Sequence, residues 1–358
     1  MIPFYINAFL ILLIDTILYV IIKKENQRRK YICFLNTLQI LLFISLRGES
    51  VGNDTQNYVN YFRLVANSPQ IAFTKEYYEI GFRWYAYIIA HITNDPRIFL
   101  TIGACFSIIP LGIIIYKYSK DCTLSFYAFC TMEFVLFAMT GMRQNVAYLF
   151  IYISYILFQS ERRLHKIGAL ALIAVGGLFH KSAWAFLIIY FLSLIKKYEI
   201  KRTIYVVGIF FAFIFRYQIG QFLVDTFYSA YKVSSSGAYS RMFIAALVLL
   251  VSIYYYKTIL GQSTTNIYGM NRVSLFPSLV DAMFLTTFFF VIALAVSACA
   301  RQGRYFFVFF VLLLPELKYI IVEDQRQLFT GILYFMLTAL MLYLFPNNGL
   351  CTNGYYFW

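Results

Sequence analysis

Several arginines in this chain of 358 residues stand beside apolar segments, where a fixed cation can bind an anion. A guanidinium group binds phosphate through two parallel hydrogen bonds, and it keeps its charge when it is partly buried. For any one of these arginines alone, the better explanation is that its side chain extends from a helix end so that the charged group reaches water. As a group with few acids to pair them, they predict a site for an anionic ligand. The arginines are Arg47, Arg143, Arg301 and Arg304.

Other side chains in the sequence have the chemistry for proton transfer. His180 lies in a turn between apolar runs, and the ordinary pKa of histidine, about 6.5, suits proton transfer near neutral pH. Glu79 begins a short helical segment, where it is a candidate general base, an acceptor for a sugar hydroxyl, or a helix N-terminal charge. Asp54 precedes another expected helix, so a role as its N-cap explains this residue at least as well as catalysis does.

The composition places these residues in a membrane protein. Hydrophobic residues make up 61% of the chain, charged residues only 13%, and the mean hydropathy is +0.70. A soluble domain has about 45–50% apolar and about 25% charged residues. We therefore exclude a soluble enzyme, a disordered protein and a nucleic-acid-binding domain, and we expect no nucleic-acid partner. The net charge of +14 is typical of the Lys and Arg excess in cytoplasmic loops of polytopic proteins.

Apolar runs approach the length of about 20 residues that a helix needs to cross a bilayer. They predict an all-α polytopic membrane protein with about 12 transmembrane helices in a single domain, 1–358. The Cys and His residues lack metal-binding spacing, so we expect no metal site. The predicted spans are Ile2–Ile22, Tyr31–Leu46, Ile98–Tyr116, Thr123–Thr140, Arg143–Gln159, Ile167–His180, Ser182–Ile195, Thr203–Tyr217, Met242–Tyr256, Leu275–Cys299, Tyr305–Ile321 and Leu328–Phe345.

Clusters of Lys and Arg orient these spans, because cytoplasmic loops carry an excess of both. The clusters at Lys23–Lys30, Arg162–Lys166 and Lys196–Arg202 are expected in the cytoplasm. On the opposite, outer face the remaining cations are mostly arginines, which this sorting does not explain. The outer face receives both termini, the loops 47–97 and 218–241, and the tight turns at Gly141–Gln144, His180–Lys181 and Ala300–Arg304.

The segment Tyr77–Ile92 has both ends on the outer face in this topology, so it is not expected to cross the membrane. It is also short and polar for a span, since it contains Glu79, Arg83 and His91. We expect a re-entrant or interfacial helix here. The alternative is a true span combined with an error elsewhere in the topology.

A series of short motifs resembles the EpsG family of bacterial polysaccharide polymerases, which is related in role to the Wzy-type O-antigen polymerases. Each motif alone is weak, but their order along the chain is fairly specific. Asn53 departs from the small residue expected in the first motif, and 218–241 and the tail after Phe345 match none. The motifs are Arg47-Gly48 with Val51–Thr55, Tyr58, Tyr61 and Phe62; Glu79–Phe82; Arg143–Ala147; Phe179–Ala183; and Arg301 with Arg304–Phe306.

The resemblance implies a glycosyltransferase of the bacterial inner membrane whose active site faces the periplasm. Its fold would be similar to the C-type membrane glycosyltransferases, which need no nucleotide sugar, and no cofactor or metal is implied. Such enzymes join undecaprenyl-pyrophosphate-linked oligosaccharide repeat units, surrounded by membrane lipid, into O-antigen or exopolysaccharide. A co-polymerase that regulates chain length is an expected partner by analogy.

The resemblance also implies residue roles. Fixed arginines would stabilise the charge that develops on the lipid pyrophosphate, and Arg47 would either bind the same group or pair with Glu79. Three residues stay open as the base for the acceptor hydroxyl: Asp54, Glu79 and His180. The residues implied in pyrophosphate and sugar binding are Arg47, Tyr58, Arg143, Gln144, Arg301, Arg304 and Tyr305.

Other functions remain as alternatives. Acids inside predicted spans, Asp15, Glu133, Asp281 and Glu316, favour a flippase or transporter of lipid-linked oligosaccharide, because intramembrane carboxylates are costly and commonly functional. The inverted repeats typical of transporters are not evident, however. A polysaccharide ligase, or a membrane acyltransferase that uses His180, is a further alternative.

Overall fold

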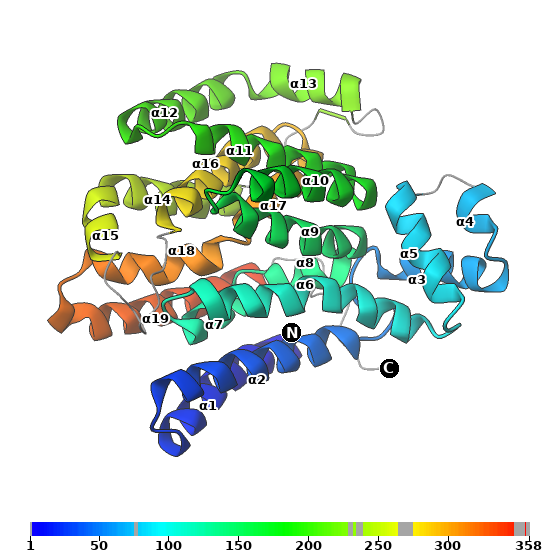
Figure 1. Cartoon of the computed structure of the whole chain (residues 1–358), viewed down its shortest axis with the longest axis horizontal. Coiled ribbons are helices and arrows are strands. Elements are labelled where there is room, and N and C mark those ends of the chain that lie inside the picture. Colours follow the sequence, from blue (N-terminus) through cyan, green and yellow to red (C-terminus); the bar gives the residue numbers. More distant parts are fainter. Residues whose placement is uncertain are drawn as a thin grey trace. The chain divides into compact units, whose positions relative to one another are not determined.

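The computed structural model describes residues 2–74, 78–227, 232–233, 239–263, 275–346 and 355, with no side chains described at 261–263 or 319. These residues form α-helices joined by short 3-10 helices and loops, and they contain no β-strand (Figure 1). The all-α fold class predicted from the apolar runs is therefore confirmed. The predicted similarity to C-type glycosyltransferases stays a prediction.

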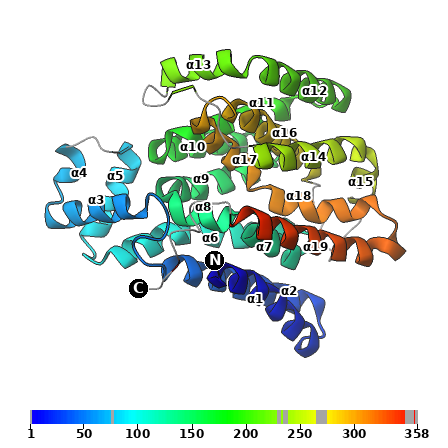
Figure 2. The same ribbon diagram turned by 180° about the vertical axis from the view of Figure 1, so that it is seen from behind.

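The chain divides into two compact units, 1–183 together with 323–358, and 184–322. Figures 1 and 2 show their helices from opposite sides. The first unit contains α1 (Ile2–Ile21), α2 (Glu25–Ser45), α3 (Thr55–Asn67), α4 (Ile71–Thr74), α5 (Ile80–Ala90), α6 (Pro96–Tyr118), α7 (Cys122–Thr131), α8 (Phe134–Thr140), α9 (Met142–Phe158), α10 (Arg163–Phe179), the 3-10 helix η4 (Glu323–Gln325) and α19 (Arg326–Leu344). The 3-10 helix η1 (Lys181–Phe186) leads into the second unit, which contains α11 (Leu187–Leu194), α12 (Tyr198–Ile214), α13 (Arg216–Phe227), α14 (Tyr239–Tyr254), α15 (Tyr256–Ser263), α16 (Phe276–Ala293), η2 (Ser297–Cys299), α17 (Ala300–Phe307), α18 (Phe310–Leu317) and η3 (Lys318–Ile320).

Within the described ranges, 4 helices are long and apolar enough to cross a membrane: α1, α6, α16 and the stretch Glu323–Leu344 that contains α19. The number rises to 7 if each bent helix pair is one span; these pairs are α7 with α8, α12 with α13, and η2–α17 with α18. A multi-pass membrane protein is thereby supported. The predicted count of about 12 spans is not confirmed, because several predicted runs form helices of 17 residues or fewer, as α9 and α10 do.

Among its described residues, the predicted outer loop 47–97 contains α3, α4 and α5 and the start of α6, and not one short helix. Helix α5 has 11 residues and is therefore about 16 Å long at 1.5 Å per residue, about half of the hydrocarbon thickness of a bilayer. This length agrees with the prediction that Tyr77–Ile92 is not a full span, although residue 77 lies outside the described ranges.

Two other predicted outer segments need correction. The loop predicted at 218–241 begins as helix, since α13 extends to Phe227. The tight turn predicted at Ala300–Arg304 is wrong, because α17 runs through it. The small residue that suggested a turn, Gly303, instead allows α17 to approach α16 closely: a Cβ there would lie 2.8 Å from the Phe290 ring. Small residues at helix contacts are typical of membrane proteins.

The first unit is held together by four helices: α2 packs on α6, α6 packs on α9, and α9 packs on α10. Gly112 of α6 lies directly against Thr37 of α2, where a Cβ would be 2.1 Å from the threonine hydroxyl. Buried Arg29 of α2 donates to the carbonyl oxygens of Ile115 at 3.2 Å, Tyr116 at 2.5 Å and Ser119 at 2.7 Å. The carbonyl of Ile115 also accepts the backbone N–H of Ser119 at 3.0 Å, so the arginine chiefly supplies donors to Tyr116 and Ser119 at the end of α6, where carbonyls lack partners within the helix.

The second unit is built on α16, most of whose side chains are buried. The buried carboxylate of Asp281 on this helix accepts a hydrogen bond from Lys201 Nζ at 2.5 Å and another from the Tyr205 hydroxyl, both on α12. All three side chains are buried. The acid that favoured a transporter therefore has a structural partner: it fastens α12 to α16.

Replacing Lys201 with methionine should destabilise this unit. Asp281 would lose its counter-charge, and removal of one partner from a buried ion pair costs about 3–5 kcal/mol. Replacing Asp281 with leucine in the same chain should recover most of the loss, because a well-packed apolar pair is often as stable as the ion pair. Thermal unfolding of the purified protein in detergent measures both effects. Equal midpoints for the wild type and the Lys201→Met variant would show that the ion pair does not stabilise the unit.

Candidate functional site

The centre of the candidate site is Arg143, the second residue of α9. Its Nη1 donates to Glu79 Oε2 at 2.6 Å, and its Nε donates to the Tyr58 hydroxyl at 3.3 Å. The guanidinium carbon lies over the Tyr78 ring, 4.9 Å from the ring centre, as in a cation–π contact. The exposed fraction of the side chain is 22% for Arg143 and 11% for Glu79. Arginine and carboxylate thus form a partly buried ion pair within reach of solvent.

Glu79 reaches this position because α5 begins directly against the end of α10. A Cβ at Gly81 would lie 2.9 Å from the backbone carbonyl of Leu178, so the glycine permits the close approach. Glu79 occupies the N-cap position of α5 but makes no capping bond with its side chain. Its Oε1 instead accepts a hydrogen bond from the backbone N–H of Lys181 at 3.3 Å. One carboxylate therefore joins the start of α5, the first turn of α9 and the first residue of η1.

His180 is the C-cap residue directly after α10, and it is buried. Its Nδ1 accepts a hydrogen bond from the backbone N–H of Ser182 at 3.2 Å, which places the proton of the neutral ring on Nε2. Helix α10 ends at Phe179 and η1 begins at Lys181, so the helix is interrupted where the turn at His180–Lys181 was predicted. His180 directly precedes Lys181, whose backbone N–H binds Glu79, so both residues belong to what we call the Arg143 cluster: Tyr58, Tyr78, Glu79, Arg143 and His180.

The electrostatics of the cluster keep Glu79 charged. Burial alone would raise the pKa of Glu79, but Arg143 and then His180 oppose it more strongly, and the net effect lowers the pKa below its ordinary value. Burial raises the pKa of Tyr78 to about 12, and the charge of nearby Asp54 acts in the same direction. At neutral pH the cluster therefore presents a carboxylate, a guanidinium and the neutral hydroxyl of Tyr78.

Arg47 occupies a different environment from the one predicted. Its side chain is 2% exposed, and it donates to the backbone carbonyl oxygens of Ile44 at 2.5 Å and Met139 at 3.0 Å. The partner of Glu79 is Arg143 and not Arg47. Asp54 stands at the N-cap position of α3 but makes no capping bond, so the structure does not confirm its explanation as a cap.

The remaining predicted residues lie in two places. Buried Gln144 follows Arg143 on α9, and its Oε1 would lie 3.5 Å from a Cβ at Gly141. Arg301, Arg304 and Tyr305 are residues of α17 in the second unit. Convergence of these arginines with Arg143 on one pyrophosphate stays a prediction.

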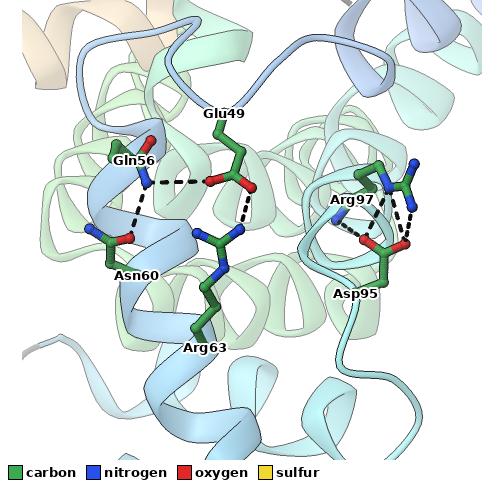
Figure 3. A network of polar contacts seen from close by, with 6 residues as sticks. All are labelled: Glu49, Gln56, Asn60, Arg63, Asp95 and Arg97. Atoms are coloured by element: carbon green, nitrogen blue, oxygen red, sulfur yellow. Dashed lines mark hydrogen bonds and ion pairs between the residues drawn. The ribbon is translucent and has the colours of Figure 1, made fainter. Parts of the chain in front are cut away.

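Two arginines predicted on the outer face pair with their own carboxylates in exposed positions (Figure 3). Arg63 binds Glu49, which also accepts a hydrogen bond from Gln56 at 3.4 Å. Arg97 binds Asp95 at 2.9 Å. The exposed fraction of the side chain is 47% for Arg63 and 57% for Arg97. These pairs differ from the Arg143 pair in solvent access, which makes them useful controls.

No role was predicted for Tyr78, although its ring covers the guanidinium of Arg143. An aromatic residue directly before Glu79 was the available signal. In the ranges that the structure describes, no group of three or more His, Cys, Asp or Glu residues is arranged to hold a metal ion.

The Glu79–Arg143 pair should make stability depend on pH. Because the pKa of Glu79 is lowered from its ordinary value of 4.5, its contribution is complete above that value and is lost as the pH falls through the lowered pKa. At neutral pH, Glu79→Gln should cost about 1.5–3 kcal/mol, the contribution of a hydrogen bond to a charged group. Thermal midpoints of the wild type and the variant should converge in acid. The exposed pair gives the control: Asp95→Asn should change the midpoint little, and a Glu79→Gln difference that is constant with pH would contradict the prediction.

Comparison with known proteins identifies a family whose sequence model matches this chain. The model of the EpsG family matches residues 30–357, which is nearly the whole chain and includes every residue of the Arg143 cluster. Neither the curated proteins nor the solved structures contain a significant match.

Proposed function

The chain belongs to the EpsG family of Wzy-type polysaccharide polymerases, and from that membership and the Arg143 cluster we propose its specific reaction. It joins undecaprenyl-pyrophosphate-linked oligosaccharide repeat units into a surface polysaccharide, O-antigen or exopolysaccharide, on the periplasmic face of the bacterial inner membrane. The growing chain leaves its lipid carrier and is transferred to the non-reducing end of a fresh repeat unit.

The proposed step is a substitution at the anomeric carbon of the donor. A hydroxyl oxygen of the acceptor forms the new glycosidic bond, and the bond from the anomeric carbon to the pyrophosphate oxygen breaks. The leaving lipid pyrophosphate keeps the electron pair, and a base takes the hydroxyl proton. The reaction therefore needs a cation where negative charge develops and a proton acceptor near the attacking oxygen.

The observation that carries the proposal is the fixed position of the Arg143 guanidinium. Tyr58 of α3 holds it from one side, and Glu79 and the Tyr78 ring, which directly precede α5, hold it from another, so its orientation is set before substrate binds. Its place in the first turn of α9 adds the positive end of the helix dipole. Preorganised cations of this kind stabilise developing charge most strongly where water is partly excluded.

The proton acceptor is one of three carboxylate or imidazole groups. Glu79 and His180 belong to the cluster, and the charge of Asp54 acts on Tyr78 within it. Because its lowered pKa makes Glu79 a weak base, its carboxylate suits an acceptor sugar hydroxyl or the orientation of Arg143 as well as proton removal. Tyr58 packs among aromatic rings and is 4% exposed, so its ring is not available to stack on a sugar. Its role in the proposal is to orient Arg143 through its hydroxyl.

Replacing Arg143 with alanine should abolish most polymer formation. Loss of one preorganised donor to a developing anion costs about 100–1,000-fold in rate. The measurement is the ladder of products made by purified protein from one defined lipid-linked repeat unit in detergent. Arg97→Ala is the matched control, since Arg97 is also paired with a carboxylate but is exposed, and it should leave the ladder intact. Normal chain lengths with Arg143→Ala would refute the proposed role.

The same assay separates the alternatives. A flippase or transporter makes no new glycosidic bond, so purified protein would leave the repeat unit unchanged. A ligase or an acyltransferase would modify a different acceptor and give no ladder of lengths. Wild-type protein that forms no ladder under any condition would therefore favour one of these functions over the polymerase.

The proposed periplasmic orientation predicts which residues can be labelled from outside intact cells. A cysteine that replaces exposed Lys181, beside the Arg143 cluster, should react with a membrane-impermeant maleimide. A cysteine that replaces Glu161, whose side chain is 91% exposed near the predicted cytoplasmic cluster, should react only after permeabilisation. The unmodified chain gives the background from the native cysteines. The reverse pattern would place the Arg143 cluster in the cytoplasm.

A further inference from the structure

The helical structure is interrupted at Gly141, two residues before Arg143. Helix α8 ends at Thr140 and α9 begins at Met142, so Gly141 alone separates them. Carbonyl groups in the last turn of α8 have no partner within the helix and need other donors. Wherever those donors come from, they determine how α8 meets α9 and hence where Arg143 points.

Side chains from two distant parts of the sequence supply these donors. Asn145 on α9 donates through its amide to the carbonyl oxygen of Ala138. The carbonyl oxygen of Met139 accepts a hydrogen bond from Arg47 Nη2 at 3.0 Å. The Thr55 hydroxyl shares its one proton between this carbonyl, at 3.0 Å, and the Val51 carbonyl, at 2.7 Å. The segment after α2 thus holds the end of α8 from outside the helix.

The loop between Arg47 and Thr55 is shaped for this contact. Gly52 has a φ of +99°, which side chains with a Cβ rarely adopt. A Cβ there would also lie 2.8 Å from the Met139 carbonyl oxygen and 2.6 Å from the Thr55 hydroxyl. The backbone therefore lies against the carbonyl that both donors bind. We call Arg47, Gly52, Thr55, Met139 and Asn145 the Met139 joint.

Arg47 also bonds the end of a second helix. Its Nη1 donates to the carbonyl oxygen of Ile44, in the last turn of α2. Burial lowers the pKa of Arg47 to about 10, so the group remains charged at neutral pH. No carboxylate forms an ion pair with it in the described part of the chain. The negative ends of two helix dipoles, those of α2 and α8, stabilise this buried cation instead.

We propose that Arg47 is a positioning residue for Arg143 and does not bind the substrate. Its guanidinium ties the end of α2 to the end of α8, and through the single residue Gly141 this contact fixes the first turn of α9. Each Nη atom donates to a helix-end carbonyl and the residue is only 2% exposed, so a phosphate could reach the guanidinium only if the packing around these helix ends opened. The consequence for polymerisation rests on the proposed function, whereas the structural role does not.

The structural role is tested without an activity assay. Hydrogen exchange, followed by mass spectrometry on the detergent-solubilised full chain, reports the opening of the amides at 142–146. Arg47→Lys keeps the charge but replaces the fork by a point donor that cannot hold both carbonyls. It should speed exchange there about tenfold or more, as should the milder Thr55→Val, while Arg97→Ala should not. If exchange at 142–146 stays at the wild-type rate in both joint variants, the positioning role is wrong.

The link to catalysis is tested with a double-mutant cycle between Arg47 and Arg143. A displacement of about 1 Å can cost about 100-fold in rate, so Arg47→Lys should slow polymerisation by up to that factor. If Arg47 acts through Arg143, Arg47→Lys should add little to the loss in Arg143→Ala. Independent binding of pyrophosphate by Arg47 predicts multiplied losses instead, and that result would overturn the proposal.

Protein stability and the proposed function are checked separately. Thr55→Val removes one hydroxyl and keeps the charge of the Met139 joint, so it should fold even if Arg47 variants do not. In that case Thr55→Val replaces Arg47→Lys in the double-mutant cycle with Arg143→Ala. If Arg143→Ala retains full activity, the proposed function fails. The exchange experiment still shows whether the Met139 joint holds the first turn of α9. If Arg143→Ala is inactive and exchange is unchanged in the joint variants, only the positioning role fails.

Discussion

Helix ends buried inside an apolar protein impose the strongest constraint on this fold. Each α-helix leaves its last carbonyl groups without partners, and neither lipid nor an apolar core can supply the missing donors. In the first unit, arginine meets this need twice. Arg29 donates to the carbonyl groups at the end of α6, and Arg47 donates to those at the ends of α2 and α8. A guanidinium suits this task because one side chain carries several donors in a fixed plane.

The same constraint separates the arginines into different classes. Arg29 and Arg47 are buried and bind backbone carbonyl groups, whereas Arg143 is partly exposed and binds a carboxylate, a hydroxyl and an aromatic face. A group that binds carbonyls of helix ends cannot leave them without opening the helices. Arg143 instead holds side chains, whose rotamers can change when an anion competes for the cation. Only the latter environment is compatible with binding and release of a substrate.

Much of the fold was predictable from hydropathy, since α1, α6 and α19 begin and end within a few residues of the predicted spans. Helix α17 was not, because Gly303 suggests a turn at Ala300–Arg304 from its type alone, whereas in the structure it lets α17 approach α16. The site was predictable in its residue types but not in its pairs. Glu79 and Arg143 are separated by 64 positions, and no local pattern shows that α5 begins against the end of α10.

Arg47 shows most clearly what a sequence pattern omits. An arginine after an apolar run has the same signature whether it binds a headgroup phosphate or caps a helix from a neighbouring segment. The difference lies in the orientation of Gly52 and Thr55, which follow from backbone conformation and not from residue type.

Solvent access explains why Arg143, among the paired arginines of the first unit, is the best candidate for charge stabilisation. Arg63 and Arg97 also bind carboxylates, but they are about half exposed, and water screens their charge. At an effective dielectric of about 20 the attraction between unit charges is roughly four times its value in water, so a cation that is 22% exposed acts more strongly on a developing anion. Complete burial would remove this advantage, because a group like Arg47 cannot reach a substrate. Catalysis by a fixed cation therefore requires intermediate burial, and Arg143 has it together with three contacts that hold its orientation.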